Sequence, residues 1–390
     1  MKMSSEKPKI CHLTTVHPPF DTRIFHKEAK SLAKAGYLVT LIAKHDKEET
    51  IDGVKILPLK TPRNRIVRMT KTLLECYRKA VKVDADLYHL HDPELIIVGW
   101  LLERRGKKVI YDVHEDYVTS IKQKNYLPSF VRNPLAKIIG LIEKVSSKLF
   151  DVIIAEKYYK ERFNQGVMVL NYPVFDNINN DLHNNNKEHS ITKIDLYKQN
   201  WGKLHWLIYT GSITEDRGAI NHTNILNITN QVGVYFVGKC SEKLANKMLK
   251  IAEESRENLI IEGVGYYVSR ETIDSRYKEN NWLAGLALFP QTPHYYRKEL
   301  TKIFEYMKNG IPILCSNFPA WKELIDETGC GIIVDPSNLI EIKEAIEWLI
   351  EHPKDRKEMG YRGRKAIEDK YNWSIEEKKL FALYEKIFTE

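Results

Sequence analysis

The chain has 390 residues, of which 43% are apolar and 29% are charged, a composition typical of a folded globular protein and not of a disordered one. This length exceeds what one hydrophobic core usually organises, so we expect two domains. The five cysteines are scattered and form no CxxC pair, which argues against a disulfide framework or a zinc ribbon and predicts reduced thiols. The N-terminal segment is polar and the longest apolar run, Leu95–Leu102, is too short to cross a bilayer, so we expect a cytoplasmic protein.

Positive charge is concentrated in the first part of the chain. Residues 1–150 contain 28 Lys/Arg and 17 Asp/Glu, whereas the remainder contains 32 and 35. Two basic clusters, within Lys55–Lys82 and in Arg104–Lys108, supply much of the excess. Such a surface attracts nucleic acid, an anionic membrane or an anionic substrate, or is simply solvated. Because no nucleic-acid motif accompanies it, we expect no nucleic-acid partner and retain peripheral binding at the inner membrane face.

In the first half of the chain, short β-branched runs alternate with amphipathic stretches, as strand–helix–strand units require. The predicted strands are Lys9–Thr15, Leu38–Ala43, Val54–Pro58, Asp86–Leu90, Lys107–Val113, Asp151–Ala155 and Val167–Leu170. The predicted helices are Ile24–Ala35, Val67–Val81, Pro93–Glu103, Pro134–Phe150 and Lys157–Phe163. Parallel strands joined by crossover helices form a doubly wound sheet.

A polar segment then interrupts the alternation. Residues 171–203 are rich in Asn, Asp and Lys, which predicts a linker or insertion. Strands are predicted again at Trp206–Thr210, Val232–Val237, Asn258–Glu262, Ala284–Phe289, Ile311–Ser316 and Gly331–Val334, and helices at Asn338–Glu351, Asp355–Tyr371 and Ser374–Thr389. We therefore expect an α/β protein in which two Rossmann-like doubly wound domains, residues 1–170 and 204–370, face a cleft.

The turn after the first predicted strand, Val16–Arg23, contains no glycine. A dinucleotide-binding fold places GxGxxG here to bring the backbone close to a pyrophosphate, so a dehydrogenase is not expected. Asp21 is either the N-cap of the next helix or an acceptor contact. Arg23, in the first helical turn, opposes the helix dipole unless Asp21 or an anionic ligand compensates it.

Histidines and aspartates follow two further predicted strands, in His89–Pro93 and Tyr111–Asp116. Strand alternation puts His89 and His91 on one face, where a metal site is conceivable, but no clear third ligand is nearby and we expect no metal. Polar residues at strand ends of such a sheet face the cleft, which favours His114 as a sugar contact over a plain surface histidine.

The second half begins with a strand–loop–helix pattern at Tyr209–Gly218. Gly211 allows a close backbone approach, and Arg217 offers a fork of donors to a phosphate. This pattern is common in α/β proteins, and it is weak evidence when taken alone.

The most informative segment is the predicted helix Lys302–Asn309. Lys302 in the first turn opposes the helix dipole unless an anion binds there, and the free amides of a helix start suit a diphosphate. Glu305, one turn further on, can accept hydrogen bonds from ribose or sugar hydroxyls. The alternative is a Lys302–Glu305 surface ion pair, which would contribute little.

The stretch Lys302–Ile313 resembles the donor-site motif of the family 4 retaining glycosyltransferases, which have the GT-B fold. Asp21–Glu28 with Leu32–Tyr37 is similar to that family's first loop and helix. Further similar segments are His91-Asp92-Pro93, Asp112-Val113-His114, Gly329–Pro336 and Tyr371–Ser374. The resemblance covers nearly the whole chain apart from the Asn-rich segment.

The resemblance implies an enzyme of bacterial or archaeal surface-polysaccharide synthesis. It would move a sugar from a nucleotide-diphosphate sugar to a glycan or lipid-diphosphate-linked acceptor, without a metal or other cofactor. Residues 1–170 would lie on the acceptor side, residues 204–370 would bind the nucleotide sugar, and residues 371–390 would cross back to the first domain. The implied catalytic residues are His114, Arg217 and Lys302; the donor-binding residues are Gly211, Ser212, Tyr266, Thr301, Ile303 and Glu305; the acceptor-side residues are Asp21, Arg23 and Asp92.

Two positions depart from the family pattern. Arg297 stands where the family often has the first of two glutamates spaced by seven residues, a glutamate that usually contacts the donor sugar. Ser212 stands where many members carry arginine, which leaves Arg217 as the only basic residue of that loop. Two alternatives therefore stay open: a sugar-nucleotide epimerase of the same fold, and a non-catalytic nucleotide-sugar-binding subunit, which Arg297 favours.

Overall fold

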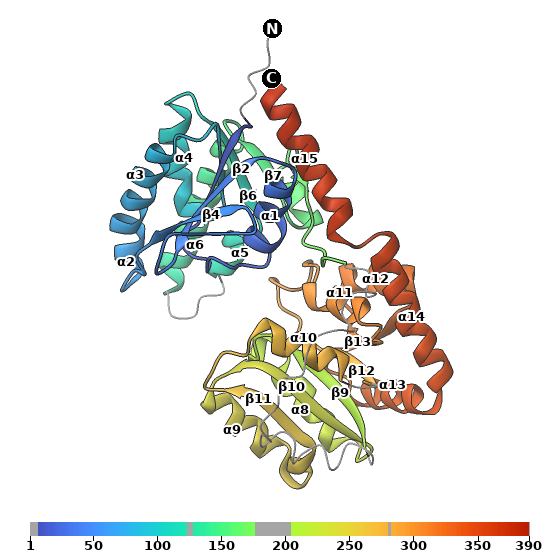
Figure 1. The fold of residues 1–390 in the computed structure, drawn as a ribbon. Coiled ribbons are helices and arrows are strands. Elements are labelled where there is room, and N and C mark those ends of the chain that lie inside the picture. Colours follow the sequence, from blue (N-terminus) through green and yellow to red (C-terminus); the bar gives the residue numbers. More distant parts are fainter. Residues whose placement is uncertain (1–6, 123–127, 176–203, 280–281, 390) are drawn as a thin grey trace. The chain divides into compact units, whose positions relative to one another are not determined.

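The computed structural model describes residues 7–122, 128–175, 204–279 and 282–389 (Figure 1). The chain forms two compact units, Met1–Val174 with Trp373–Glu390, and Phe175–Asn372, which we call the first and the second domain. Most of the predicted Asn-rich linker, from residue 176 to 203, lies outside the described residues. Within the described part of the chain, no helix is both long enough and apolar enough to cross a membrane. All five cysteines are buried and unpaired.

The first domain is built on a sheet of eight strands. These are β1 (Lys9–Leu13), β2 (Leu38–Lys44), β3 (Glu49–Ile51), β4 (Val54–Leu59), β5 (Leu87–Leu90), β6 (Lys108–Val113), β7 (Asp151–Ile154) and β8 (Val167–Met168). Their order is β3-β4-β2-β1-β5-β6-β7-β8, and only β3 runs antiparallel to its neighbour. The strand order reverses between β1 and β5, which makes that edge the topological switch point of the sheet.

Helices cover both faces of this sheet and enclose two hydrophobic cores. One core includes Cys76 and Ala80 of α3 (Leu73–Val83) and Leu102 of α4 (Ile96–Glu103). The other joins the π-helix η1 (Ile24–Ala29) and α1 (Lys30–Lys34) to the last helix, α15 (Trp373–Thr389). The remaining helical segments are α2 (Arg65–Val67), η2 (Arg68–Thr72), η3 (Pro93–Leu95), α5 (Tyr117–Lys122), α6 (Ser129–Ser146) and η4 (Lys157–Glu161).

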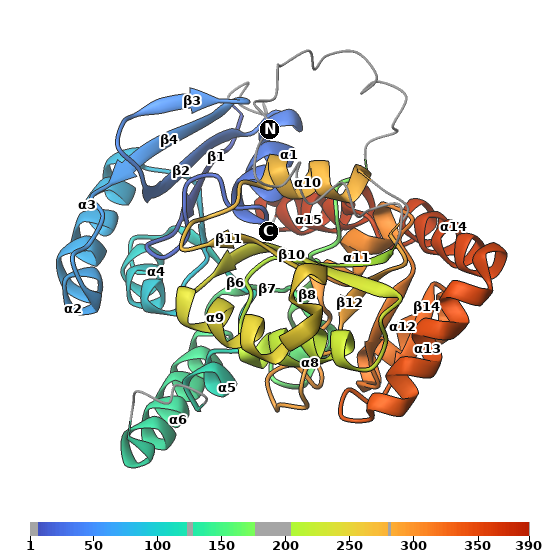
Figure 2. The ribbon, with the colours of Figure 1, turned by 90° about the horizontal axis from the view of Figure 1, so that it is seen from below.

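Helix α15 belongs to the first domain although it is the last element of the chain. The Trp373 indole donates a hydrogen bond to Ser31 Oγ (2.8 Å), and Ser31 Oγ donates to Glu377 (2.7 Å). Glu376, which is buried, accepts a hydrogen bond from the Leu170 amide at 2.8 Å. Figures 1 and 2 both show α15 alongside α1.

The second domain has a six-stranded, fully parallel sheet. Its strands are β9 (His205–Thr210), β10 (Val232–Cys240), β11 (Leu259–Val264), β12 (Ala284–Ala287), β13 (Ile313–Ser316) and β14 (Gly331–Val334), in the order β11-β10-β9-β12-β13-β14. The switch point lies between β9 and β12. The helical segments are η7 (Glu215–Arg217), α8 (Ala219–Asn224), η8 (Ile225–Asn227), α9 (Glu242–Ile251), η9 (Glu253–Asn258), α10 (Arg270–Lys278), α11 (Thr301–Lys308), α12 (Pro319–Thr328), α13 (Leu339–Glu351) and α14 (Pro353–Asp369).

The prediction of an α/β protein with two Rossmann-like doubly wound domains is confirmed. Two short elements were not predicted, β3 and α5. Helix α6 also begins at Ser129, five residues before the predicted start at Pro134, and carries that proline inside it.

Candidate active site

Each sheet brings predicted site residues to its own switch point. In open α/β sheets, ligands bind beyond the carboxyl ends of the strands where the strand order reverses. Asp92 follows β5 in the first domain, and Gly211 follows β9 in the second. The two sets of residues are described in turn, beginning with the second domain.

Lys302 is the most unusual charge of the second domain. It is 8% exposed, and its Nζ lies 3.1 Å from the centre of the Tyr209 ring. This Nζ has no hydrogen-bond partner within the described residues. Burial and the nearby Arg217 guanidinium hold the pKa of Lys302 well below its usual value. An amine that is buried away from water and lies next to an arginine would be stabilised by an anionic ligand.

Packing of α11 against the switch point fixes Lys302 there. Gly285 of β12 has no side chain, so the Tyr306 ring lies directly on it. The Tyr306 hydroxyl donates to the carbonyls of Ile208 and Leu286, at 3.2 Å each, which ties the helix to β9 and β12. The helix starts at Thr301 without a side-chain cap and without an acidic residue in its first turn.

Glu305 lies one turn after Lys302 and is held by two side chains of α10. Its Oε2 accepts a hydrogen bond from the Tyr277 hydroxyl (2.9 Å), and its Oε1 pairs with Arg270. The alternative of a Lys302–Glu305 surface ion pair is therefore wrong, because Lys302 is buried and Glu305 pairs with Arg270. Arg270 and Tyr277 were not predicted, since nothing local to either residue marks them.

Arg217 is held by a tyrosine. Its Nε donates to the Tyr295 hydroxyl (3.1 Å), which itself donates to Asp216 (3.1 Å). Burial alone would lower the pKa of Arg217, but its contacts with Tyr295 and Tyr209 raise it. Arg217 therefore stays charged, and it lies beside the basic side chain of Lys302 at this switch point.

Three glycines bring neighbouring strands into backbone contact at the same edge. Gly211, Gly238 and Gly263 have φ values of 92°, 148° and 112°. A Cβ on Gly238 would lie 1.9 Å from the Gly211 carbonyl oxygen, and one on Gly263 would lie 2.2 Å from that of Gly238. Apart from its chain neighbours, no atom of the described residues lies within 4 Å of the Cβ position of Gly211, so its backbone is open to a ligand. Gly211 was predicted as a site residue, whereas Gly238 was missed because a lone strand-end glycine is a weak signal.

The other predicted donor-binding residues differ in how accessible they are. Ser212 is exposed, Thr301 is half-buried, and Tyr266, which follows β11, is 54% exposed. Ile303 is fully buried, and its amide already donates to the Leu300 carbonyl at 2.9 Å. The side chain of Ile303 therefore belongs to the hydrophobic core, and its role in donor binding stays a prediction.

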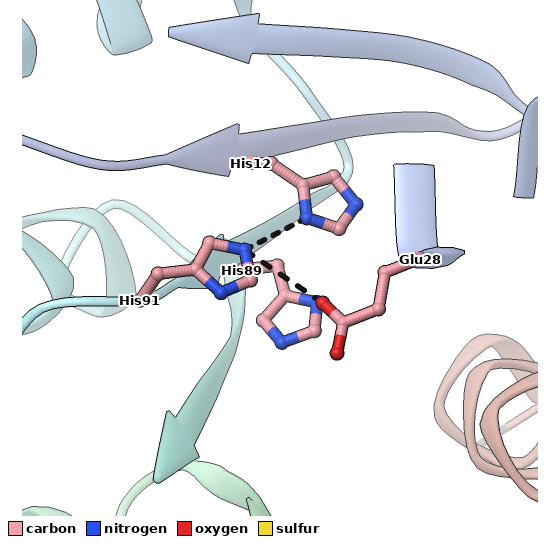
Figure 3. Close-up of side chains that lie close together, drawn as sticks. All are labelled: His12, Glu28, His89 and His91. Atoms are coloured by element: carbon pink, nitrogen blue, oxygen red, sulfur yellow. Dashed lines mark hydrogen bonds and ion pairs between the residues drawn. The ribbon is translucent and has the colours of Figure 1, made fainter. Parts of the chain in front are cut away.

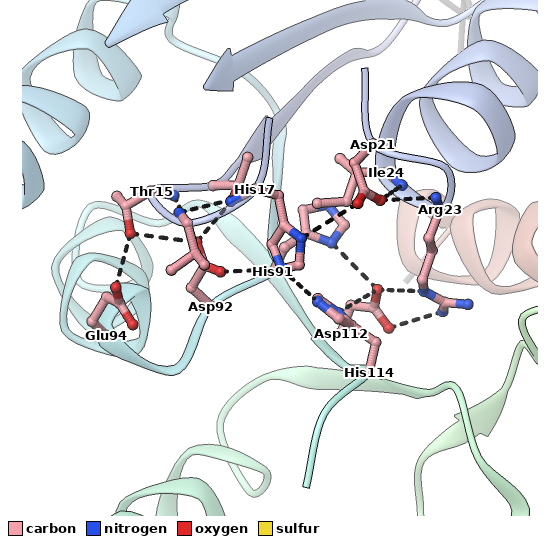
Figure 4. Close-up of polar contacts among 12 residues, drawn as sticks. Thr15, His17, Asp21, Arg23, Ile24, His91, Asp92, Glu94, Asp112 and His114 are labelled. Carbon is pink, nitrogen blue, oxygen red and sulfur yellow. Dashed lines mark hydrogen bonds and ion pairs between the residues drawn. The ribbon is translucent and has the colours of Figure 1, made fainter. Parts of the chain in front are cut away.

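In the first domain, Asp92 organises the loop after β1 (Figure 4). Its Oδ2 accepts hydrogen bonds from the Thr14 hydroxyl (2.9 Å) and from the amides of Thr15 (2.6 Å) and Val16 (3.2 Å). The side chain is fully buried. Asp92 therefore positions the loop, and its place on the acceptor side stays a prediction.

Arg23 forms a buried ion pair with Asp112. Its Nε and one terminal nitrogen donate to the two carboxylate oxygens at 2.8 and 2.9 Å, and the guanidinium also contacts Glu28 at 3.0 Å. Burial would raise the pKa of Asp112, but Arg23 and two histidines hold it well below its usual value. Arg23 is 3% exposed and is compensated by Asp112 and Glu28, so its acceptor-side role stays a prediction.

Asp21 caps the start of η1. Its Oδ1 accepts hydrogen bonds from the amides of Arg23 (2.8 Å) and Ile24 (3.0 Å), as the N-cap alternative predicted. Its Oδ2 lies 3.4 Å from His17 Nδ1. Asp21 remains partly accessible, with 23% of the side chain exposed.

His114 lies between Asp112 and His17. Its Nδ1 is 3.3 Å from Asp112 Oδ2, and its Nε2 is 3.0 Å from His17 Nε2. Burial would lower the pKa of His17, but Asp21 and Asp92 raise it. His17 was not predicted as a site residue, although it lies in the glycine-free turn. The first domain thus offers three partly accessible polar side chains, Asp21, His17 and His114.

Behind this loop, four buried side chains come close enough to share an ion (Figure 3). They are His12 on β1, His89 and His91 at the end of β5, and Glu28 on η1. The expectation that His89 and His91 lack a third ligand is therefore wrong. However, His12 Nδ1 and His91 Nε2 already form a hydrogen bond of 2.9 Å, and His89 Nδ1 bonds to the Tyr384 hydroxyl at 2.8 Å. An ion would have to break the first of these bonds, so the absence of a metal stays a prediction.

Two protein families match this chain. The model of "Glycosyltransferase Family 4" matches residues 22–157, and that of "Glycosyl transferases group 1" matches residues 300–366, which contain Lys302 and Glu305. Together the two matches cover just over half of the chain. The chain belongs to the family 4 glycosyltransferases. It has their GT-B fold, with one Rossmann-like domain in each half.

Solved structures with this fold include glycosyltransferases of very different sequence. Sucrose-phosphate synthase from Thermosynechococcus elongatus is 15% identical with a TM-score of 0.74, over 98% of this chain and 100% of that one. HepE from Anabaena in complex with UDP is 12% identical with a TM-score of 0.67, over 98% and 100%. WaaG, a glycosyltransferase involved in lipopolysaccharide biosynthesis, is 13% identical with a TM-score of 0.65, over 95% and 98%.

A relative of known activity also matches, over a short region. It is the MMP alpha-(1->4)-mannosyltransferase of Mycolicibacterium hassiacum, 26% identical over 95 residues, or 24% of this chain. The matched region spans 23% of that relative.

Proposed function

We propose that this family 4 glycosyltransferase transfers a sugar from a nucleotide-diphosphate donor to a glycan or lipid-diphosphate-linked acceptor, with retention at the anomeric carbon and without a metal. The observation that carries the proposal is the buried Lys302, which lies next to Arg217 at the switch point and has no hydrogen-bond partner among the described residues. The Lys302 amine at the start of α11 and the nearby Arg217 guanidinium fit a diphosphate.

The fold relatives support this donor class. HepE from Anabaena has been solved with UDP and with UDP-glucose. WaaG acts in lipopolysaccharide biosynthesis, which supports an acceptor of the cell-surface type. An acceptor of this type at the inner membrane face would make the protein a peripheral membrane protein of the cytoplasm.

The proposed reaction breaks the bond between the anomeric carbon and the donor phosphate and forms a bond to an acceptor hydroxyl on the same face. Negative charge develops on the departing diphosphate, where Lys302 and Arg217 stabilise it as fixed cations. A phosphate oxygen of the leaving group takes the acceptor proton. Glu305, oriented by Arg270 and Tyr277, holds the ribose, and His114 contacts the transferred sugar.

Arg297 favours a second candidate, a subunit that binds nucleotide sugar without transferring it. It is exposed and occupies the position of the family glutamate that usually contacts the donor sugar. An epimerase would instead convert the donor when no acceptor is present. Incubating the protein with nucleotide sugars, with and without a membrane extract as acceptor source, separates the three functions.

The decisive variant is Lys302→Ala, with Lys308→Ala at the other end of the same helix as its control. We expect Lys302→Ala to lower kcat at saturating donor by about 100- to 1,000-fold, because a stabilising charge is removed from the transition state. Lys308→Ala should retain activity. Unchanged turnover in Lys302→Ala would contradict the assignment, and NMR of the product's anomeric centre tests retention.

A further inference from the structure

Helix α6 turns a set of its apolar side chains away from the domain. Five of them, from Val131 to Val145, are exposed by 36–62%: Val131, Leu135, Ile138, Leu141 and Val145. Because they recur every three or four residues, they form one continuous stripe along the helix. Phe130 and Leu149, at 77% and 55% exposed, extend the stripe at its two ends.

The part of α6 that packs on the domain carries polar and small residues as well as the partly buried Ile142. Glu143 and Ser146 are fully buried there, beside the small residue Ala136. Glu143 accepts a hydrogen bond from the Tyr111 hydroxyl (2.9 Å) and pairs with Arg162 (2.5 Å). A surface helix of a globular protein normally buries most of its apolar residues, so the exposed apolar stripe of α6 is unusual. An exposed apolar strip of this length marks an interaction surface.

A row of lysines borders the stripe. Lys137, Lys144 and Lys148 are exposed and, at spacings of seven and four residues, lie on one side of the helix. Among the described residues, none of the three forms an ion pair. Glu143 is the only acidic residue between Ser129 and Ser146, and it is buried, so the exposed part of α6 is purely basic.

This charge pattern decides between two occupants of the stripe. A second copy of α6 would bring like charges together, which disfavours self-association. An anionic lipid surface instead accepts apolar side chains at the acyl boundary and lysines at its head groups, as interfacial amphipathic helices do.

The basic cluster Arg104–Lys108 is less suited to this role. Lys107 pairs with Asp84 at 2.6 Å, and the Lys108 ammonium bonds to the Ile387 carbonyl of α15. These two lysines therefore already interact with other groups of the first domain. Figure 2 shows α6 with α5 at the periphery of the first domain.

We propose that the exposed face of α6 is a membrane-docking surface that binds anionic phospholipid. The inference rests on the lipid-linked acceptor proposed above. It names α6 as the helix that contacts the membrane in which this acceptor lies.

The experiment is co-sedimentation of the full chain with phosphatidylglycerol/phosphatidylcholine vesicles and with pure phosphatidylcholine vesicles. We expect binding to the anionic vesicles only, weakened by salt. The double variant Ile138→Ser/Leu141→Ser and the triple variant Lys137→Glu/Lys144→Glu/Lys148→Glu should each lower the partition coefficient about 10-fold or more. All substituted positions are exposed, so folding should be retained.

Matched controls lie in the second domain. Ile340→Ser/Tyr361→Ser removes equally exposed apolar groups, and Lys354→Glu/Lys357→Glu/Lys365→Glu changes charge by the same amount. Both should bind vesicles as the wild type does. Equal binding by the α6 variants, or a dimer in sedimentation equilibrium that Ile138→Ser/Leu141→Ser abolishes, would overturn the proposal. Thermal shift with nucleoside diphosphates reports the donor site separately, so failure of this proposal is distinguishable from failure of the proposed function.

Discussion

Two buried charges of this protein, Asp112 and Lys302, have contrasting surroundings. Asp112 has Arg23 on both carboxylate oxygens and two histidines beside it, so its charge is fully compensated within the first domain. Lys302 lies over the faces of Tyr209 and Phe289 and is repelled by Arg217, and among the described residues its Nζ has no hydrogen-bond partner, although Glu305 attracts it. A buried charge without a counter-charge destabilises a fold, and such positions are characteristic of binding sites. The missing negative charge beside Lys302 is what a donor diphosphate would supply.

The contact between Gly211 and Gly238 gives a prediction at the residue scale. In Gly238→Ala the new Cβ would lie 1.9 Å from the Gly211 carbonyl oxygen, at a φ of +148°. Two strand ends would have to separate, so we expect a loss of about 3 kcal/mol or more of unfolding free energy in urea denaturation of the second domain. Weaker nucleotide binding should accompany it.

Gly106→Ala is the matched control for this prediction. Gly106 also has a positive φ, of 74°, but in the described part of the chain only its own neighbours lie within 4 Å of its Cβ position. Only the backbone penalty of about 1 kcal/mol applies there. Equal losses of unfolding free energy in the two variants would show that backbone strain, and not the close approach of the two strands, explains the effect of Gly238→Ala.

The site could be predicted from sequence only as far as local patterns reach. Lys302, Glu305 and Gly211 lie in a strand-to-helix arrangement that a short window reveals. Arg270 and Tyr277 orient Glu305 from more than 25 residues away, and only the fold brings them there. Motif position also does not specify side-chain direction, so Arg23, Asp92 and Ile303 matched family positions but are buried.

At the scale of elements, the strands of both sheets were predicted because buried parallel strands are continuous apolar runs. Strand β3 was missed since it has three residues, although Asp52-Gly53, both with positive φ, is a hairpin signal between it and β4. Helix α5 was missed because Ile121 is its only buried side chain, so the helix shows little apolar periodicity. The direction of α6 could not be predicted, because periodicity does not tell which side of a helix packs on the domain.

The buried histidines between β1, β5 and η1 lead us to expect that the first domain loses stability in mild acid. Burial lowers the pKa of His12, His89 and His91, so below a pH of about 6.5 the unfolded chain binds protons that the folded chain does not. Stability therefore falls as the pH drops through this range, by about 1.4 kcal/mol per pH unit for each histidine. Burial also raises the pKa of Glu28, so the folded chain takes up a proton on Glu28 once the pH falls below that raised value. This proton offsets the effect of one of the three histidines.

Hydrogen exchange of the β1 amides between pH 7.5 and 5.5 measures this effect for the first domain alone. In His12→Gln the pH dependence of the opening free energy should be smaller by about one proton. His352→Gln, a half-buried histidine of the second domain, serves as the control. A wild-type slope in His12→Gln would contradict the assignment of the acid sensitivity to this cluster.

At the scale of the whole molecule, the second domain places two basic side chains where many phosphate-transfer sites use a metal ion. Lys302 and Arg217 are both held in place by the fold, and the negative charge of a bound diphosphate would favour the protonated form of Lys302. We therefore expect EDTA to leave sugar transfer unchanged.

The cluster of His12, Glu28, His89 and His91 provides a direct test for a bound metal, because these side chains lie close enough together to hold an ion. Elemental analysis of the purified protein should find no stoichiometric zinc, and EDTA should not shift the melting temperature. One zinc per chain, lost together with stability in EDTA and absent from His89→Gln, would show that the first domain is a metalloprotein. Loss of transfer in EDTA without a stability change would instead place the metal at the donor.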